Sequence, residues 1–556
     1  MKSLIELNTK RNYSKQWIFK TIAVLLPFFI VILVEIILHL CNYGYDTSLF
    51  IEDKTGKYYL LNPEISQKYF TVPENATRGN IELFTKDKKP GTIRIFVLGE
   101  STTIGFPYMH NGAFPRMLKY RLQFDYPNIN FEIINLSLTA VNSYTLYDFS
   151  KQLVNYKPDA ILIYAGHNEY YGALGVASSS RIGRNTMWVR TTLAIKEFKT
   201  GQFLFRIAAR LKGTDKKTTD YTLTLMERMA REQSIPFNSK IHQQGIRQFE
   251  INMTELLDLF GKHKIPVYIS NLVSNLKDRK PFISSAGNLS ANNQYQSGNK
   301  AYAGKDYISA KREYMLAKEY DELPFRAPEM INLLIKKYTL NRPNVHFVDV
   351  MHVFELHSPH GIPDSTLFLE HVHPNLKGQR LISDAFYTEL IKSGMLPVPK
   401  ENTHSPSMRP EAYPFTAFDS IFGQISIWLL KEQWPFNEPI PKEDHQHRKT
   451  VEEQIAGACA VKQLNWFDSM HSLYDFYKQK NDMVNALHIM EGLCLEFPYE
   501  QEYFLLAGKL SIIQNKEQKA LFYLNNANQI SPSGEANSLI QLMKHQQLSG
   551  NLKRNF

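Results

Sequence analysis

Four short polar segments of this 556-residue chain have residue types that could carry chemistry. A serine that follows a strand and opens a helix lies where the helix N-terminus favours developing negative charge. Glu370 and His373 are three residues apart, so a carboxylate and an imidazole can meet. A histidine oriented by a carboxylate is the base that a serine nucleophile needs. In chain order, the segments are Gly99-Glu100-Ser101-Thr102, Asn135-Leu136-Ser137-Leu138-Thr139-Ala140, Gly166-His167-Asn168-Glu169 and Glu370-His371-Val372-His373-Pro374.

Each segment has an ordinary alternative when it is taken alone. Ser101 could simply cap a helix, and Asn168, whose carboxamide could donate to an oxyanion, could be a turn residue. His371 is an alternative base to His373. A metal site is a further alternative, but the chain has no HExxH motif, so we expect no metal and no cofactor. That alternative would use the histidines that lie within 28 residues of one another, which are His346, His352, His357, His360, His371 and His373.

The elements that must position these residues alternate between strands and helices. Runs rich in β-branched residues predict strands at 92–98, 131–135, 160–164, 267–272 and 345–350, and a helical pattern covers 241–263. This alternation predicts a parallel sheet with helices on both faces. Such sheets have their sites at the carboxyl ends of the strands, where the first three polar segments fall.

Taken together, the four segments resemble the four sequence blocks of the GDSL/SGNH hydrolase family. The resemblance covers residues 89–395, apart from insertions at about 175–238 and 283–330. It implies a flavodoxin-like three-layer α/β/α domain and acyl-ester chemistry. The longer motifs GESTT, TAVNSYT and AGHNEYYG are similar to those of a membrane-anchored bacterial branch of this family, which has C-terminal helical repeats.

The resemblance also implies roles for individual residues. Ser101 would be the nucleophile, His373 the base and Glu370 the residue that orients the imidazole. The Ser101 N–H, the Ala140 N–H and the Asn168 side chain would form the oxyanion hole. Three residues depart from the family pattern, which has Asp where this chain has Glu100 and Glu370, and Gly where it has Ala140. We expect Glu100 to serve packing, and the longer Glu370 puts the histidine geometry in doubt.

Four further residues are candidates for substrate contact. Gly166 opens the third polar segment, and Asn271 and Asn275 follow the fourth strand at its active-site end. Arg326 lies where the second insertion rejoins the core and could bind an anionic substrate group. The alternatives are turn roles for the asparagines and a structural ion pair for Arg326.

A membrane anchor is predicted near the N-terminus. Residues 21–40 are apolar enough to cross a bilayer. We therefore expect a basic tail at 1–16, a transmembrane helix at 17–40 and an extracytoplasmic collar at 41–88. By the positive-inside rule the N-terminus is cytoplasmic and the catalytic domain is extracytoplasmic, or periplasmic in a Gram-negative cell. A cleaved signal peptide is the alternative, but the apolar run is long for one.

The net charge of +10 is concentrated in two segments. Residues 1–20 have five basic side chains against one acidic, and residues 181–217 have ten against two. The second segment also contains aromatic residues, so it could lie on the membrane or bind an anionic polymer. A solvated helical face is the alternative. We expect no nucleic-acid partner for a domain that faces outward.

The C-terminal part is predicted to be helical. Residues 396–445 have the composition of a connector, with one helical stretch near 418–431. In residues 446–556, Ala486 and Ala520 are 34 residues apart, as are Pro498 and Pro532. This period resembles the tetratricopeptide repeat and predicts a protein partner. A plain helical bundle is the alternative.

We therefore expect a membrane-anchored extracytoplasmic serine esterase that cleaves an acyl ester on an envelope carbohydrate or lipid. One alternative is an O-acyltransferase that uses the same triad on a polysaccharide. The other is a repeat scaffold with a decayed hydrolase domain.

Overall fold

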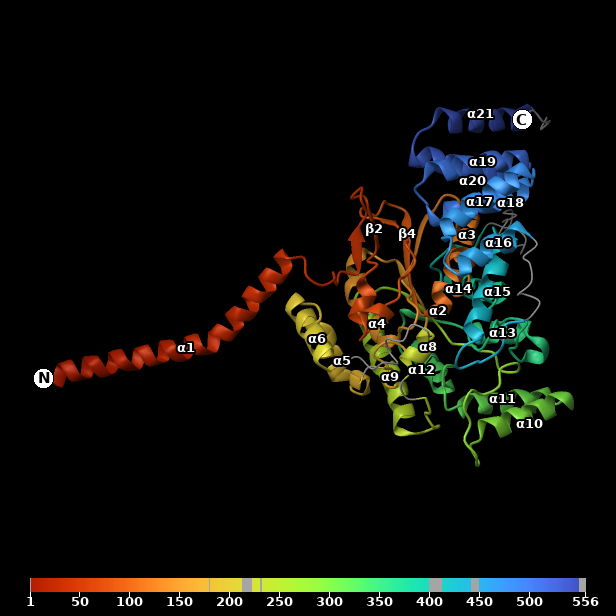
Figure 1. Cartoon of the computed structure of the whole chain (residues 1–556). Coiled ribbons are helices and arrows are strands. Elements are labelled where there is room, and N and C mark those ends of the chain that lie inside the picture. The colour runs from red at the N-terminus through yellow and green to blue at the C-terminus, as the bar shows by residue number, and fades with distance from the viewer. Residues whose placement is uncertain are drawn as a thin grey trace.

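The computed structural model of the chain describes residues 2–179, 181–212, 223–230, 233–399, 413–441 and 450–549, and within them no side chain of 2–16, 18, 181, 212 or 546–549. Its centre is a five-stranded parallel sheet, which confirms the predicted α/β class (Figure 1). The order β5-β4-β6-β7-β8 corresponds to 2-1-3-4-5 along the chain, the order of flavodoxin-like sheets. The strands are β4 (Thr92–Gly99), β5 (Asn130–Asn135), β6 (Ala160–Tyr164), β7 (Val267–Ser270) and β8 (Val345–Val348).

Two strands end earlier than expected. The chain leaves the sheet after Ser270 and Val348, where the Asn271 amide donates to the Asp349 carboxylate over 2.7 Å. Helices cover both faces, so the strands read as nearly continuous apolar runs. α3 (Phe114–Asp125) and α14 (Leu376–Lys392) pack together on one face. On the other face lie α4 (Ser143–Leu153), α9 (Lys240–Lys262) and α12 (Glu329–Leu340).

The segment expected as a collar packs directly on the α/β core. It forms a small antiparallel sheet of β1 (Phe50–Glu52), β2 (Tyr58–Leu61) and β3 (Phe84–Thr85). Phe50 and Phe84 belong to the same hydrophobic core as Phe96 of β4. A buried ion pair joins Lys68 Nζ to Asp148 of α4 at 2.6 Å.

The two insertions are largely helical. The first contains α5 (Thr186–Ile195), α6 (Lys199–Lys212) and α8 (Leu225–Met229), and residues 213–217 of the basic segment lie outside the described residues. The second begins with the non-helical residues 283–290 and continues as a helical pair, α10 (Ala291–Ala303) and α11 (Tyr307–Glu319). α10 begins at the Ser290 cap, and its Gly298 lies against the Tyr314 ring of α11, so polar side chains are left on its outer side.

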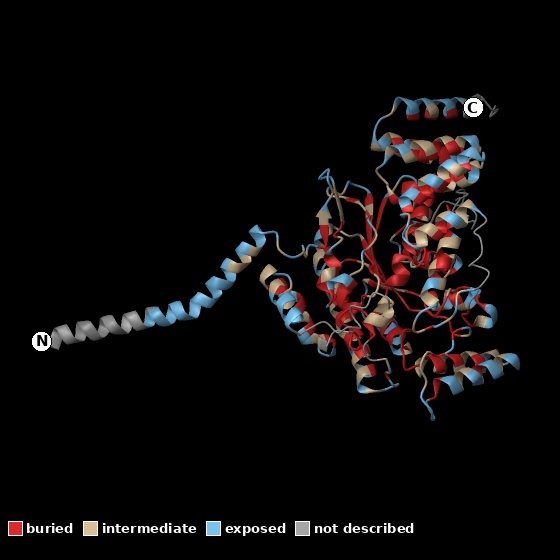
Figure 2. Cartoon of the chain, in the orientation of Figure 1, coloured by how far each residue is buried: buried red, intermediate tan, exposed pale blue. Residues whose placement is uncertain are grey.

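The N-terminal helix α1 (Lys2–Leu40) projects away from the rest of the chain, and its described side chains are mostly exposed (Figure 2). Among the described residues it is the one helix long and apolar enough to cross a membrane, over the 22 residues Phe19–Leu40. Its apolar surface is therefore not used in the protein core.

The C-terminal region is helical, as predicted. α18 and α20 each have 14 residues and begin 34 residues apart, while the repeat assignment itself stays a prediction. Its core includes Met117, Tyr120 and Phe124 of α3, so this region packs against the α/β domain. Its helices are α15 (Ala417–Lys431), α16 (Val451–Ala460), α17 (Trp466–Gln479), α18 (Met483–Glu496), α19 (Gln501–Ile513), α20 (Glu517–Ile530) and α21 (Gly534–Ser549).

Two short α-helices flank the carboxyl edge of the sheet, α2 (Ser101–Ile104) after β4 and α13 (Val350–His357) after β8. The short 3-10 helices are η1 (Ile65–Lys68), η2 (Pro73–Asn75), η3 (His110–Gly112), η4 (Val154–Tyr156), η5 (Arg181–Arg184) and η6 (Pro359–Gly361).

Candidate active site

The structure brings Ser101, His373 and Glu370 into one hydrogen-bonded line. Ser101 is the first residue of α2, directly after β4, and the other two lie between η6 and α14. The His373 Nε2 atom is 2.8 Å from Ser101 Oγ, and His373 Nδ1 is 2.6 Å from Glu370 Oε1. Such an arrangement allows the imidazole to take the serine proton while the carboxylate fixes the ring.

The backbone around it holds the Glu370 carboxylate in place. Its Oε1 atom accepts the His373 N–H at 2.6 Å and the Val372 N–H at 3.3 Å, and its Oε2 atom accepts the His371 N–H at 2.6 Å. The side chain thus folds back over its own turn. The extra methylene of glutamate is accommodated in this way without moving the carboxylate away from His373.

Burial sets the charge state of the imidazole. His373 is 7% exposed, and burial lowers its pKa from the ordinary value. The ring is therefore neutral near pH 7 and can accept a proton from Ser101. The adjacent Glu370 carboxylate stabilises the imidazolium that this transfer creates.

His371, the alternative base, takes a different position. Its Nδ1 atom contacts the other Glu370 oxygen, and its ring packs edge-on against Phe282 and Phe436. Burial lowers its pKa well below the ordinary value, so it too is neutral. The histidine that contacts Ser101 Oγ is His373, so the geometry favours His373 over His371 as the base.

The expected oxyanion donors have backbone that suits the role. Ala140 has φ +58°, the left-handed conformation in which the family pattern has glycine. In the described parts of the chain, neither the Ser101 N–H nor the Ala140 N–H donates to another protein group. Both are thus available to a developing negative charge.

Glu100 positions the third donor. Its carboxylate accepts the Gly166 N–H and the Asn168 N–H, each at 3.1 Å. Burial, and then the neighbouring Glu169, raises the pKa of Glu100 to about 8. We expected Glu100 to serve packing, and in the structure its side chain also fixes the turn that carries Asn168.

Each of the four expected substrate-contact residues has partners within the protein, and their contact with a substrate stays a prediction. The Gly166 N–H is bound to Glu100, and a Cβ there would lie 2.7 Å from Leu272. Arg326 is buried in an ion pair with Asp321 at 3.1 Å, because a charge enclosed by the insertion needs a partner.

The two asparagines are occupied in a similar way. The Asn271 side chain bridges Asp349 and the Met351 N–H at the ends of two strands. Asn275 accepts the Asp278 N–H with its side chain and an Arg326 N–H with its carbonyl.

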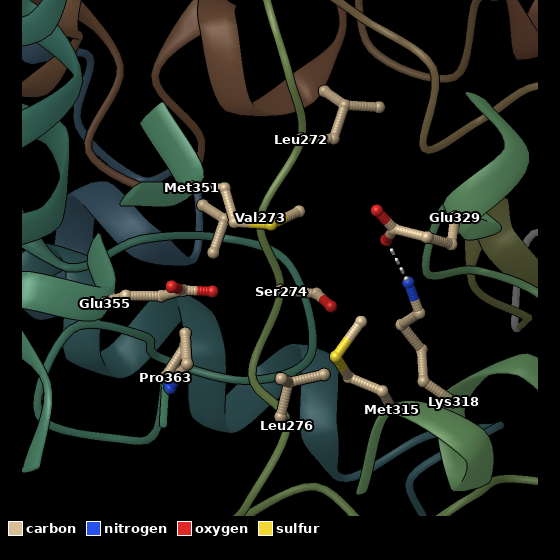
Figure 3. Close-up of a pocket in the computed structure, with 10 residues that line it drawn as sticks. All are labelled: Leu272, Val273, Ser274, Leu276, Met315, Lys318, Glu329, Met351, Glu355 and Pro363. Carbon is tan, nitrogen blue, oxygen red and sulfur yellow. Dashed lines mark hydrogen bonds and ion pairs between the residues drawn. The ribbon is translucent and has the colours of Figure 1, made fainter. Parts of the chain in front are cut away.

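A small pocket lies beside the carboxyl end of β7 and does not include the triad (Figure 3). Its wall carries the ion pair between Lys318 and Glu329, 3.5 Å apart. Of the histidines after residue 345, His371 and His373 lie beside each other against Glu370, whereas His346 stacks on Tyr268 and His360 stacks on Tyr307. Across the described ranges, no three His, Cys, Asp or Glu side chains form a group that could hold a metal.

Sequence reasoning missed the loop at residues 105–113, which joins the triad to the C-terminal helices. The Phe106 ring lies edge-on to the His373 ring, with centroids 4.8 Å apart. Further along, His110 stacks on Trp466 of α17 at 4.3 Å, and its Nδ1 atom is 3.1 Å from Glu496 of α18.

The backbone of this loop is strained. Met109 has φ +51° with ψ −164°, and His110 has φ +33°. Non-glycine residues keep such conformations only where the surrounding structure fixes them. The C-terminal helices supply that support to the loop beside His373.

A serine, a buried imidazole and a carboxylate at the carboxyl edge of a parallel sheet define a site of the Ser-His-acid hydrolase type. No family model and no curated protein matches the sequence. Solved structures to which the chain is similar include GDSL-like lipases and acylhydrolases. One is a GDSL-like lipase from Bacteroides thetaiotaomicron, which is 12% identical over 56% of this chain and 93% of that chain, with a TM-score of 0.28.

Two other structures extend the comparison. An esterase from Pseudoalteromonas sp. is 13% identical over 55% of this chain and 99% of its own, with a TM-score of 0.25. A gut microbial diltiazem-metabolizing enzyme is 12% identical over 84% of this chain and 95% of its own, with a TM-score of 0.31.

Proposed function

We propose that this chain is a membrane-anchored serine esterase of the SGNH type that acts on an acyl ester outside the cytoplasm. The observation that carries the proposal is the line from Ser101 Oγ through His373 to Glu370, with distances of 2.8 Å and 2.6 Å. Ser101 is 9% exposed and His373 7%, which favours a small acyl group. An acylated carbohydrate or lipid of the cell envelope is the substrate class that we infer.

The reaction begins when Ser101 Oγ attacks the ester carbonyl and its proton passes to His373 Nε2. The oxyanion that forms accepts hydrogen bonds from the Ser101 N–H, the Ala140 N–H and the Asn168 amide. His373 then gives its proton to the departing alcohol as the carbon–oxygen bond breaks, which leaves an acyl-serine. A water molecule, deprotonated by His373, releases the acid and restores Ser101.

The anchor in this proposal rests on α1. A described apolar stretch of 22 residues that packs on no core suits a bilayer. We place the N-terminus in the cytoplasm and the α/β domain outside. A protein partner for the C-terminal helices stays a prediction.

The direct test is hydrolysis of a short-chain aryl ester by the full-length protein in detergent. Ser101→Ala should abolish the activity, and Ser150→Ala is the matched control, because Ser150 is a buried serine of α4. Equal rates for wild type and Ser101→Ala would refute an esterase.

A second measurement separates the alternatives. Labelling of Ser101 by a fluorophosphonate without ester hydrolysis would show a competent triad and favour the O-acyltransferase. Absence of both labelling and hydrolysis would favour the scaffold with a decayed site.

A further inference from the structure

Helix α6 is attached to the end of the anchor helix. The Glu35 side chain of α1 accepts the Lys199 N–H at 2.8 Å with Oε1 and the Thr200 N–H at 2.7 Å with Oε2. These are the first two residues of α6, whose N–H groups have no partner within the helix. Glu35 therefore serves as an N-terminal cap for α6, although it comes from within the apolar stretch Phe19–Leu40.

Contacts just after the anchor fix the first turns of α6. The Gln202 side chain bonds the backbone of Tyr45, and the Phe203 ring lies edge-on to Tyr43 with centroids 5.6 Å apart. Lys199 Nζ also donates to the Tyr45 carbonyl. The start of α6 is thus held beside the end of α1 (Figure 1).

The remainder of α6 presents an uncovered apolar face. Leu204, Ile207 and Leu211 follow the spacing of one helix face, and they are 57%, 37% and 82% exposed. Arg206 and Arg210 are exposed on an adjoining face. Single exposed apolar side chains are common on protein surfaces. Three of them on one helix face beside basic residues are typical of a helix that lies in a membrane interface.

The position of Glu35 along α1 indicates how deep α6 would lie in a bilayer that α1 spans. Glu35 precedes the end of the apolar stretch by five residues, which at 1.5 Å per residue is about 7.5 Å along the helix axis. Interfacial helices bury their apolar face about 5–10 Å into the boundary between headgroups and acyl chains. The cap therefore sets α6 at the depth that its side chains require.

We propose that α6 lies on the surface of the bilayer that holds α1, with Leu204, Ile207 and Leu211 among the acyl chains and Arg206 and Arg210 at lipid phosphates. This inference rests on the proposed anchor and not on the proposed esterase activity. Its consequence is a catalytic domain held against the membrane by two helices, so the domain has a fixed orientation to the lipid surface.

The test places a fluorophore on α6 in the full-length protein. Cys41 and Cys459 are first changed to serine, and Cys494 is buried and unreactive. Leu204→Cys or Leu211→Cys is then labelled with an environment-sensitive dye in vesicles of phosphatidylethanolamine and phosphatidylglycerol at 7:3. Ile308→Cys is the matched control, because Ile308 is an apolar residue of α11 that is 87% exposed.

We expect lipids brominated on their acyl chains to quench the dye at residues 204 and 211 at least threefold more than at residue 308. Vesicle flotation of the same samples separates the two proposals. Protein that does not float refutes the anchor, whereas protein that floats but shows equal quenching at 204, 211 and 308 overturns the interfacial position of α6.

A second variant tests the cap itself. Glu35→Leu keeps the apolar stretch but removes the acceptor for the Lys199 and Thr200 N–H groups. Hydrogen exchange of the peptide that contains residues 199–203 should accelerate at least tenfold in floated protein, with the exchange of α11 unchanged. Unchanged exchange at 199–203 would contradict the cap.

Discussion

Trp466→Ala should reduce catalysis although Trp466 lies in the C-terminal helices. Its ring stacks on His110 in the strained loop whose Phe106 packs against His373. Met109 and His110 hold backbone conformations that cost of the order of 1–3 kcal/mol each. Removal of the ring allows the loop to relax away from the position that supports His373.

The size of the effect follows from the contacts that are lost. An aromatic stack contributes about 0.5–1.5 kcal/mol beyond its buried area. The remaining support comes from Glu496 at 3.1 Å from His110 and from Tyr413, which donates to the Asn111 carbonyl at 3.0 Å. A loss of about 0.5–1.5 kcal/mol of support for His373 would reduce kcat/KM by about two- to thirteenfold.

The assay must separate this effect from general loss of stability. Leu473→Ala is the control, because Leu473 is fully buried two turns further along the same helix. Each substitution should destabilise the protein by about 2–5 kcal/mol. Aryl-ester hydrolysis and fluorophosphonate labelling are measured well below the melting temperature and divided by the folded fraction from circular dichroism. Equal activity per folded molecule in the two variants would refute the reasoning.

Three other outcomes are expected. Glu370→Gln should lower kcat per folded molecule by about 10⁴-fold, since the amide cannot stabilise the imidazolium, and it should also lower the melting temperature, since an NH₂ group cannot accept the backbone N–H groups that the carboxylate accepts. A loss in kcat under tenfold would contradict the assigned role. Because burial lowers the pKa of His373, the rate should fall with decreasing pH only below about 6.5, the ordinary value, and an acid limb in kcat/KM above that value would be inconsistent with this cause. Glu100, with its pKa raised to about 8, binds more protons folded than unfolded between pH 4.5 and 8, so the free energy of unfolding should fall as pH rises across that window. Glu100→Gln should make this decrease in the free energy of unfolding smaller, by at most about 4 kcal/mol, when urea titrations at pH 4.5 and pH 8 are compared. An equal decrease in wild type and Glu100→Gln would contradict the raised pKa of Glu100.

The sheet and the three residues of the triad could be predicted because their signals are local. β-Branched runs mark the strands, and Ser101 stands directly after one of them. Glu370 and His373 are close in sequence, so their contact needs no knowledge of the fold.

Other features depend on contacts between distant segments. Arg326 has the chemistry of an anion-binding residue, and only its burial beside Asp321 shows the structural role. Helix α10 has a polar sequence because one side packs on α11 and the rest faces solvent. Nothing in the local sequence relates His110 to Trp466, or Glu35 to the first turn of α6.

The buried contact between Tyr120 of α3 and Glu491 of α18 spans 371 residues of chain, and that from Tyr413 to Asn111 spans 302. Closing loops of this length is slow compared with forming the α/β sheet, whose strands follow one another along the chain. A ribosome delivers the anchor and the sheet long before α17 and α18. The loop beside His373 can therefore reach its final form only after α17 and α18 have emerged and packed, so a chain that stops before them has the triad residues but not the support that they need.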